Sequence, residues 1–239
     1  MLVEITEQEP LMRYSTFLLD LDHTLFDSDA SESAAFAQTM AAAGVGNPAR
    51  YAASYQSINL ELWARVERGE ISPQHVRTRR FERLAAEEDI DADPLQMAED
   101  FVSGLGANGD LYDGAREMLE QLSDQATLAL ITNGLGEVQR TRIERLGIDE
   151  YFDAVVISAE VGAAKPGTKI FDIAFEALDF PSRKRSLMVG DNLASDIQGG
   201  ANYGIATCWY NPNGDSVRDA DHVVHEINDL AELLGLVAV

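Results

Sequence analysis

Short apolar runs that end abruptly in polar residues recur along the chain and predict buried β-strands. The first covers residues 17–19 and leads directly into Asp20 and Asp22. A run that is apolar on both faces is typical of a strand in the interior of a parallel sheet. Further runs of this kind lie at residues 128–131, 154–158, 187–189, 205–210 and 222–224.

Segments with helical periodicity alternate with these strands from residue 113 onward. Residues 113–123 place their apolar side chains on one helix face, and Asp113 suits the N-cap position. Gly147 suits the C-terminal end of a helix at 137–146. Comparable helices are expected at 170–178, 193–203 and 227–234. This alternation predicts an α/β protein with a Rossmann-like parallel sheet as its core.

Residues 28–107 show helical periodicity and little strand signal. Helices are expected at 31–43, 48–67, 73–87 and 94–105, and Pro48, Pro73 and Pro94 suit the starts of three of them. We therefore expect an all-helical domain of residues 28–107, inserted into an α/β core of residues 1–27 and 108–239. Residues 1–13 are expected to form a loose or edge segment.

The composition is that of a globular protein with little affinity for nucleic acid or membranes. The 239 residues carry a formal net charge of −23, which opposes binding to either polyanion. No apolar run approaches the roughly 18 residues of a membrane span, and residues 1–15 lack the pattern of a secretory signal. We therefore expect a cytoplasmic protein, either a monomer or a homodimer. The single cysteine, Cys208, is expected to be a buried structural thiol.

The charged residues are also unusual in kind. The 18 basic residues include only three lysines, Lys165, Lys169 and Lys184. An acid-rich, lysine-poor surface suits a cytoplasm of high salt concentration, because salt screens the self-repulsion. We therefore expect a halophilic source, the alternative being an ordinary acidic protein.

Reactive side chains follow the predicted strands. The spacing of Asp20 and Asp22 predicts that both carboxylates point to the same side of the first strand. Two like charges this close require a cation or a shared proton, whereas the alternative is a simple Asp-rich turn or helix N-cap. The carboxyl ends of parallel strands are where such sheets bind ligands. Later strands lead into four residues suited to phosphate or metal, namely Thr132, Lys165, Asp191 and Asp196.

This ordered set resembles the haloacid dehalogenase superfamily of phosphatases. The shared pattern is D-x-D-x-T at the first strand end, a strand-end threonine, a lysine before proline, and G-D-x-x-x-x-D, all within residues 16–196. The resemblance implies a Mg²⁺-dependent phosphomonoesterase that acts on a small phosphorylated metabolite. It also implies that the helical domain is a cap that closes over the active site.

The resemblance assigns the central chemistry to three aspartates. Asp20 is expected to be the nucleophile that forms an aspartyl-phosphate, and Asp22 to protonate the leaving group and then activate water. Mg²⁺ is expected to bind the side chain of Asp20, the main-chain carbonyl of Asp22 and the carboxylate of Asp191.

Further roles follow from the same resemblance. Lys165 is expected to stabilise the phosphoryl group and orient the nucleophile, and Asp196 to support Lys165 or metal-bound water. Thr132 and the backbone at Asn133 and Gly134 are expected to bind phosphoryl oxygens. The alternatives are a turn residue at Thr132 and a solvated surface charge at Lys165.

Several stretches resemble more narrowly the noncanonical-pyrimidine 5′-nucleotidases of this superfamily. They lie at 59–63, 69–71 and 80–82 in the cap, and at 131–134, 156–162, 164–166, 188–191 and 206–209 in the core. The resemblance implies pyrimidine nucleoside 5′-monophosphates as substrates. Trp63 is a candidate to stack on the base and Arg80 to contact ribose or phosphate. The alternatives are a core aromatic and a solvated or ion-paired arginine.

Other functions remain open at this point. A phosphatase for phosphoglycolate or sugar phosphates, or a phosphomutase, would share the motifs, and a non-catalytic phosphate-binding regulatory protein would share the fold. A haloalkanoate dehalogenase is disfavoured, because a departing halide needs no proton from Asp22. A phosphonate hydrolase is disfavoured because residues 28–107 contain no lysine for a Schiff base.

The net charge predicts that salt stabilises the protein. The Debye length is about 10 Å at 0.1 M salt and about 3 Å at 1 M, so most of the screening is complete at moderate concentrations. We expect the melting temperature to rise from low to molar KCl, with the steepest rise at the low end. A melting temperature that stays constant or falls would contradict salt adaptation.

Overall fold

A central parallel sheet organises the chain. The computed structural model describes residues 13–216 and 221–238. Within these ranges lies a six-stranded sheet of order β3-β2-β1-β4-β5-β6, in which every neighbouring pair is parallel. Its strands are β1 (Thr16–Leu19), β2 (Thr127–Thr132), β3 (Ala154–Ile157), β4 (Ser186–Gly190), β5 (Ala206–Tyr210) and β6 (His225–Ile227).

The strand order reverses direction beside β1. From β1 the chain builds outward through β2 to β3, then returns to β4 on the other side of β1 and continues to β6. In open sheets of this kind, ligands bind in the crevice at the carboxyl ends of the strands where the order reverses. The residues that follow β1 and β4, including Asp20 and Asp191, therefore lie at the expected ligand-binding position.

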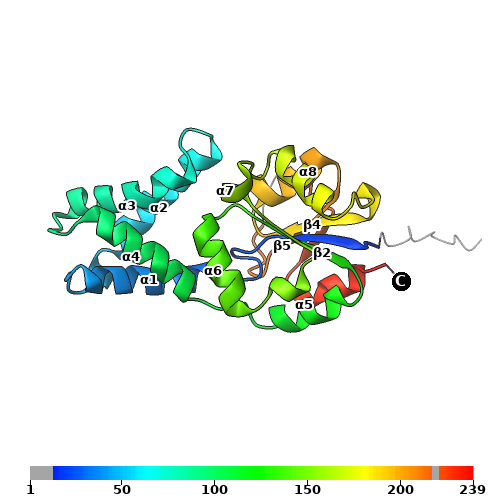
Figure 1. Cartoon of the computed structure of the whole chain (residues 1–239), viewed down its shortest axis with the longest axis horizontal. Coiled ribbons are helices and arrows are strands. Elements are labelled where there is room, and N and C mark those ends of the chain that lie inside the picture. Colours follow the sequence, from blue (N-terminus) through cyan, green and yellow to red (C-terminus); the bar gives the residue numbers. More distant parts are fainter. Residues whose placement is uncertain (1–12, 217–220, 239) are drawn as a thin grey trace, which may run out of the picture.

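Helices cover both faces of the sheet. Phe17 and Leu19 pack in a cluster with α5 (Ala115–Ser123), α6 (Gly136–Leu146) and the 3-10 helix η5 (Leu230–Leu236), whereas Leu18 packs against α8 (Thr168–Ala177) and α9 (Gln198–Tyr203). Alternate side chains of a strand point to opposite faces, so β1 is buried on both sides. Figure 1 shows α5 and α8 on opposite sides of the sheet.

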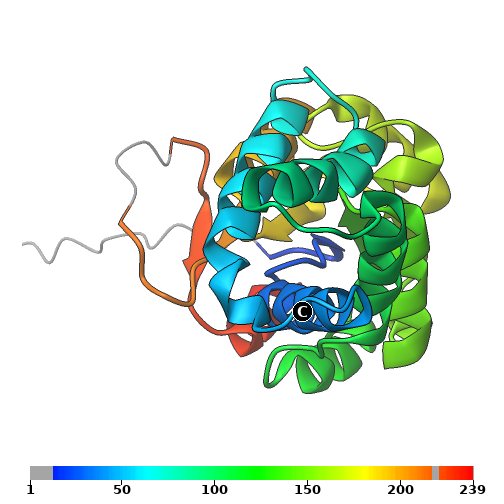
Figure 2. The same ribbon diagram turned by 90° about the vertical axis from the view of Figure 1, so that its left-hand side faces the viewer.

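A second group of helices forms a cap with its own apolar core. It comprises α1 (Ser28–Ala42), α2 (Ala52–Glu67), α3 (Pro73–Glu88) and α4 (Pro94–Ala107), with a short 3-10 helix η1 (Pro48–Arg50) before α2. A separate cluster of buried side chains, including Phe36, Phe81 and Phe101, holds them together. Figure 2 views the molecule from the side of this group, which lies in front of the sheet.

The architecture confirms the predicted fold class, a Rossmann-like core with a helical cap. The chain crosses between the two parts twice, and the crossings lie side by side, since the Asp27 amide donates to the Asp110 carbonyl at 3.0 Å. The division at residues 28–107 stays a prediction.

Some predicted elements are misplaced. The strand expected at 222–224 is wrong, because β6 pairs with β5 only from His225, opposite Cys208, and Val224 is exposed. The sheet register thus overrides the β-propensity of the valines. Asp113 is not a helix cap, since α5 begins two residues later after Gly114, whose φ of 79° turns the chain.

Other boundaries shift by a few residues. Helix α1 starts three residues earlier than expected because the Asp27 side chain accepts a hydrogen bond from the Ala30 amide and caps it. The segment at 193–203 is a π-helical turn, η4 (Leu193–Ile197), followed by α9. The C-terminal helix is the 3-10 helix η5, which begins after a capping box formed by Asp229 and Glu232.

Two predictions made from composition can be compared with the structure. Cys208 is buried in β5, and burial raises the pKa of its thiol to about 12, consistent with a structural role. The described residues include no helix of the length and apolar character that spanning a membrane requires. The segment expected to be loose or at an edge lies outside the described residues, except for Arg13.

Candidate active site

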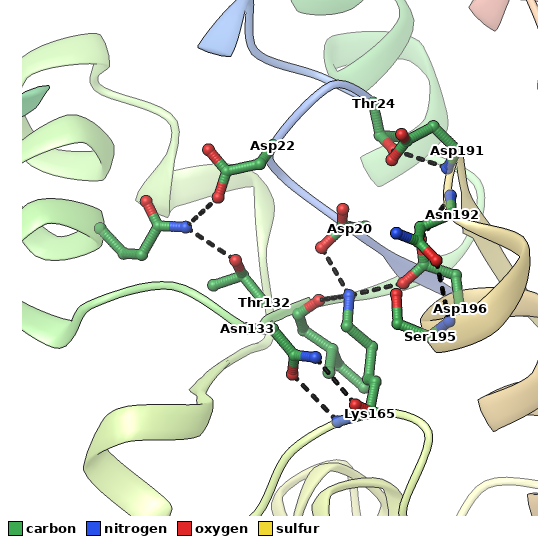
Figure 3. Close-up of polar contacts among 12 residues, drawn as sticks. Asp20, Asp22, Thr24, Thr132, Asn133, Lys165, Asp191, Asn192, Ser195 and Asp196 are labelled. Carbon is green, nitrogen blue, oxygen red and sulfur yellow. Dashed lines mark hydrogen bonds and ion pairs between the residues drawn. The ribbon is translucent and has the colours of Figure 1, made fainter. Parts of the chain in front are cut away.

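Lys165 is the centre of a buried cluster at the carboxyl end of the sheet. Its ammonium group donates to Asp20 Oδ1 at 2.5 Å and to the Ile131 carbonyl at 2.7 Å, and it pairs with Asp196 Oδ1 at 2.7 Å. The side chains of Lys165, Asp20 and Asp196 are all buried (Figure 3). Burial opposes the charge of Lys165, but Asp196 and Asp20 outweigh it and raise the pKa of this lysine.

Three carboxylates converge beside Lys165. One oxygen from each of Asp20, Asp191 and Asp196 lies within 4.8 Å of the others. Burial raises the pKa of Asp20 well above its usual range, and neighbouring carboxylates add to the effect while Lys165 opposes it. Burial, with a smaller effect of Asp196, raises the pKa of Asp191 to about 6. Electrostatic repulsion is therefore concentrated at this point.

The donor set fits the expected magnesium ion. The cluster offers only carboxylate oxygens, the ligands that Mg²⁺ prefers, and a divalent cation favours the charged forms that burial opposes. Asp196 already pairs with Lys165 through Oδ1 and accepts from the Asn192 amide at 3.0 Å through Oδ2. Asp196 therefore contacts Lys165, and its support of Lys165 or of metal-bound water stays a prediction.

A glycine makes room for Asp196. At Gly190, the last residue of β4, a Cβ atom would lie 2.2 Å from Asp196 Oδ2. Only a residue without a side chain allows this close approach. The glycine of the G-D motif thus places Asp196 against Lys165.

Hydrogen bonds from neighbouring side chains fix the backbone at Asp191 and at Lys165. The Thr24 hydroxyl accepts from the Asp191 amide at 3.1 Å, and the Trp209 indole N–H donates to the Asp191 carbonyl at 2.8 Å. Asn133 bonds the backbone of Lys165 twice, donating to its carbonyl at 2.8 Å and accepting from its amide at 2.9 Å. In the structure Asn133 positions Lys165, while its contact with a substrate stays a prediction.

Thr132 ends β2 with its side chain buried. Its Oγ1 accepts a hydrogen bond from Gln139 Nε2 at 2.7 Å, which leaves the threonine hydroxyl hydrogen free to be donated elsewhere. At Gly134 a Cβ atom would lie 2.3 Å from Gln139 Nε2, so the glycine admits the glutamine side chain. Gly134 therefore acts in the structure by making space beside Thr132.

The carboxylate of Asp22 does not point to the same side as that of Asp20, in contrast to the prediction from their spacing. The Asp22 carboxylate points toward α6, away from Lys165 (Figure 3). Oδ1 accepts from Arg142 Nη1 and from Ser28 Oγ, both at 2.6 Å, and Oδ2 accepts from Gln139 Nε2 at 2.5 Å. The reason is that β1 ends at Leu19, so strand alternation no longer holds at Asp22.

The two aspartates consequently have opposite pKa shifts. Burial alone would raise the pKa of Asp22, but Arg142, Ser28 and Gln139 together lower it below its usual range. Arg142 and Gln139 were not identified from the sequence. The one available signal is that both lie on the buried face of α6, between the apolar Val138 and Ile143.

The two cap candidates lie in different environments. Trp63 is partly buried and packs against the cap core. Arg80 is 2% exposed, donates to Tyr55 and Asn59, and lies 4.8 Å from the Phe101 ring centre. This burial favours a structural role for Arg80 within the cap, and its contact with substrate stays a prediction.

Comparison with known proteins identifies the family. The family described as haloacid dehalogenase-like hydrolase matches residues 17–210. The chain belongs to this family. The position of Asp20, Asp22, Lys165 and Asp191 at the carboxyl end of the sheet agrees with the membership.

Two curated relatives and one solved structure are similar to most of the chain. The chain is 38% identical to the pyrimidine 5′-nucleotidase YjjG of Escherichia coli, over 84% of this chain and 87% of that protein. It is 35% identical to the pyrimidine 5′-nucleotidase PynA of Streptococcus pneumoniae, over 84% and 86%. The crystal structure of the HAD-hydrolase YfnB of Bacillus subtilis, bound to magnesium and revealing interdomain movement, superimposes with a TM-score of 0.88 at 30% identity. It covers 95% of this chain and 100% of that one.

These relationships confirm the predicted enzyme class and the resemblance to the pyrimidine nucleotidase group. The protein is a hydrolase of the phosphoric monoester class. The cytoplasmic location, the halophilic source and the oligomeric state stay predictions.

Replacement of Lys165 tests the centre of the cluster. In Lys165→Met, the buried carboxylates of Asp20 and Asp196 lose their cation. We expect phosphatase activity to fall by about 10²-fold or more, and the free energy of unfolding in urea to fall by about 3–5 kcal/mol. Lys169→Met, on the exposed surface of α8, is the matched control and should keep both values. Full activity in Lys165→Met would contradict the assignment.

Proposed function

We propose that the protein is a Mg²⁺-dependent phosphomonoesterase that acts through an aspartyl-phosphate on Asp20, with pyrimidine nucleoside 5′-monophosphates as substrates. The observation that carries this proposal is the convergence of Asp20, Lys165, Asp191 and Asp196 where the strand order reverses. Such a cluster, charged and buried, suits a ligand that brings both an anion and a metal.

Different side chains would bind the metal and the phosphoryl group. Asp20, the main-chain carbonyl of Asp22 and Asp191 would hold Mg²⁺, which supplies positive charge that offsets repulsion between the carboxylates and the phosphate dianion. Lys165 neutralises charge on the nucleophile and on the phosphoryl oxygens. The Thr132 hydroxyl donates to a phosphoryl oxygen, since its acceptor side is occupied by Gln139.

Hydrolysis then takes two steps. A carboxylate oxygen of Asp20 attacks phosphorus as the bond to the leaving oxygen breaks, and Asp22 gives its proton to that oxygen. In the second step a water attacks the aspartyl-phosphate and passes a proton to Asp22, which releases inorganic phosphate and restores Asp20. Asp22 must therefore visit the phosphate site in both steps.

The substrate class rests on the relatives and on the position of the cap. Two relatives with 38% and 35% identity are pyrimidine 5′-nucleotidases. We take residues 28–107 as the cap that closes on the leaving group and thus selects it. Trp63 is the side chain we assign to stacking on the base, and Arg80 acts indirectly by fixing Asn59 and Tyr55 inside the cap.

Metal dependence tests the mechanism. We expect excess EDTA to abolish phosphatase turnover and Mg²⁺ to restore it, because the carboxylates otherwise repel the phosphate. Asp20→Asn and Asp22→Asn should each lose orders of magnitude in kcat, about 10²–10⁴-fold for the acid–base residue. The secondary structure measured by circular dichroism should stay unchanged. Undiminished turnover in EDTA, in protein shown to be free of metal, would contradict the mechanism.

A ranked series of kcat/KM values tests the substrate class. We expect pyrimidine nucleoside 5′-monophosphates to rank above phosphoglycolate and hexose phosphates. The margin should be modest, at most about two decades, because stacking a base on an aromatic ring contributes about 1–3 kcal/mol. Trp63→Leu should remove most of the preference. If sugar phosphates or phosphoglycolate outrank every pyrimidine nucleotide, the substrate class is wrong while the phosphatase chemistry stands.

Two other outcomes would indicate the alternative functions. Transfer of phosphate to a second sugar would indicate a phosphomutase, and binding without turnover would indicate a regulatory protein.

A further inference from the structure

The acid–base residue is held away from the phosphate site in this structure. Both carboxylate oxygens of Asp22 accept hydrogen bonds, from Arg142, Ser28 and Gln139. A carboxylate held by three partners in this way is fixed in one orientation. It also lies on the α6 side of the site, whereas Lys165 and the three clustered carboxylates lie on the other (Figure 3).

Arg142 is in turn bonded to the first and the last helix of the cap. Its Nε donates to the Leu105 carbonyl in α4 at 3.0 Å, and its Nη2 donates to Ser31 Oγ in α1 at 3.1 Å. Ser31 Oγ also donates to the Leu105 carbonyl at 3.1 Å, which closes the network. The guanidinium is buried and lies 4.4 Å from the ring centre of Phe26.

This arrangement connects the cap mechanically to Asp22. Arg142 is carried by α6 of the core, but two of its bonds lead to the first helix of the cap and to the last. Ser28, the third donor to Asp22, is the first residue of α1. A shift of α1 and α4 relative to α6 therefore moves Ser28 away from Asp22 and changes the bonds that fix the Arg142 guanidinium against it.

We propose that Arg142 is a positioning residue that withholds Asp22 from the phosphate site until the cap moves. Rearrangement of α1 and α4 on closure over a leaving group releases Asp22 from Arg142 and Ser28, so that it can carry a proton to the leaving oxygen. The acid is thereby delivered only to substrates that the cap encloses. This inference rests on the proposed function, because it assigns Asp22 the acid–base role.

The test separates proton delivery from all other contributions to the rate. Cleavage of 4-nitrophenyl phosphate needs little help from an acid, because the leaving phenolate is stable, whereas cleavage of ethyl phosphate requires a proton. We would measure the single-turnover rate of enzyme phosphorylation with both substrates and Mg²⁺. The quantity compared is the ratio of the ethyl to the nitrophenyl rate.

Three variants make the comparison specific. Arg142→Met removes the main partner of Asp22, and Ser28→Ala removes a single hydrogen bond to the same oxygen with little change in volume. Arg140→Met is the matched control, since Arg140 lies on α6 but pairs with Glu160 at the surface. We expect the ratio to rise by about tenfold or more in Arg142→Met, by a smaller factor in Ser28→Ala, and to stay at the wild-type value in Arg140→Met.

The outcomes distinguish the proposals. If Arg142 were merely structural, both rates would fall together and the ratio would not change, and this result would overturn the inference. A fall in the ratio would also overturn it, because Arg142 would then assist proton delivery. If Arg142→Met does not fold, the ratio in Ser28→Ala decides alone. Wild-type protein that cleaves neither substrate would instead refute the proposed function.

Discussion

The buried ion pairs of Lys165 with Asp20 and Asp196 are the interaction on which the rest of the site depends. Three carboxylates are brought together at the carboxyl end of the sheet, where burial and mutual repulsion oppose their ionisation. A buried charge of this kind is stable only with close partners of opposite charge and full hydrogen bonding. Much of the local structure meets that need. Asn133 fixes the backbone that carries Lys165, and the absence of a side chain at Gly190 admits Asp196.

The fold gives two nearby aspartates different chemistry. Burial, reinforced by neighbouring carboxylates, raises the pKa of Asp20, whereas an arginine and two neutral donors outweigh burial and lower the pKa of Asp22. In the proposed mechanism Asp20, beside Lys165 and Asp191, attacks phosphorus and binds metal, and Asp22 exchanges protons once it leaves its present partners. Because Asp22 is held by α6 and by the first residue of the cap, its position depends on how the two parts of the molecule sit together. Under the proposals above, this dependence would link specificity to proton transfer through one side chain.

Much of this site could be predicted from local sequence. The apolar runs that precede Asp20, Thr132 and Asp191 are strands, and parallel pairing brings their ends together. The order of the motifs also placed Lys165 correctly. Contacts between distant segments could not be predicted. Arg142 contacts Asp22 across a separation of 120 residues, and its position on the buried face of α6 gives no sign of its partner. Likewise the register of β6 depends on pairing with β5, not on its own residues.

The most direct test of the central claim is to identify the residue that carries phosphate during turnover. Protein mixed with substrate and Mg²⁺ would be quenched in acid within milliseconds, digested and examined by mass spectrometry. The mechanism predicts a phosphoryl group on Asp20 that is lacking in Asp20→Asn. With 4-nitrophenyl phosphate, whose leaving group needs little acid, the phosphoryl group should be more abundant in Asp22→Asn, because only hydrolysis of the intermediate is then slowed. Phosphate on any other residue, or turnover by Asp20→Asn at the wild-type rate, would contradict it.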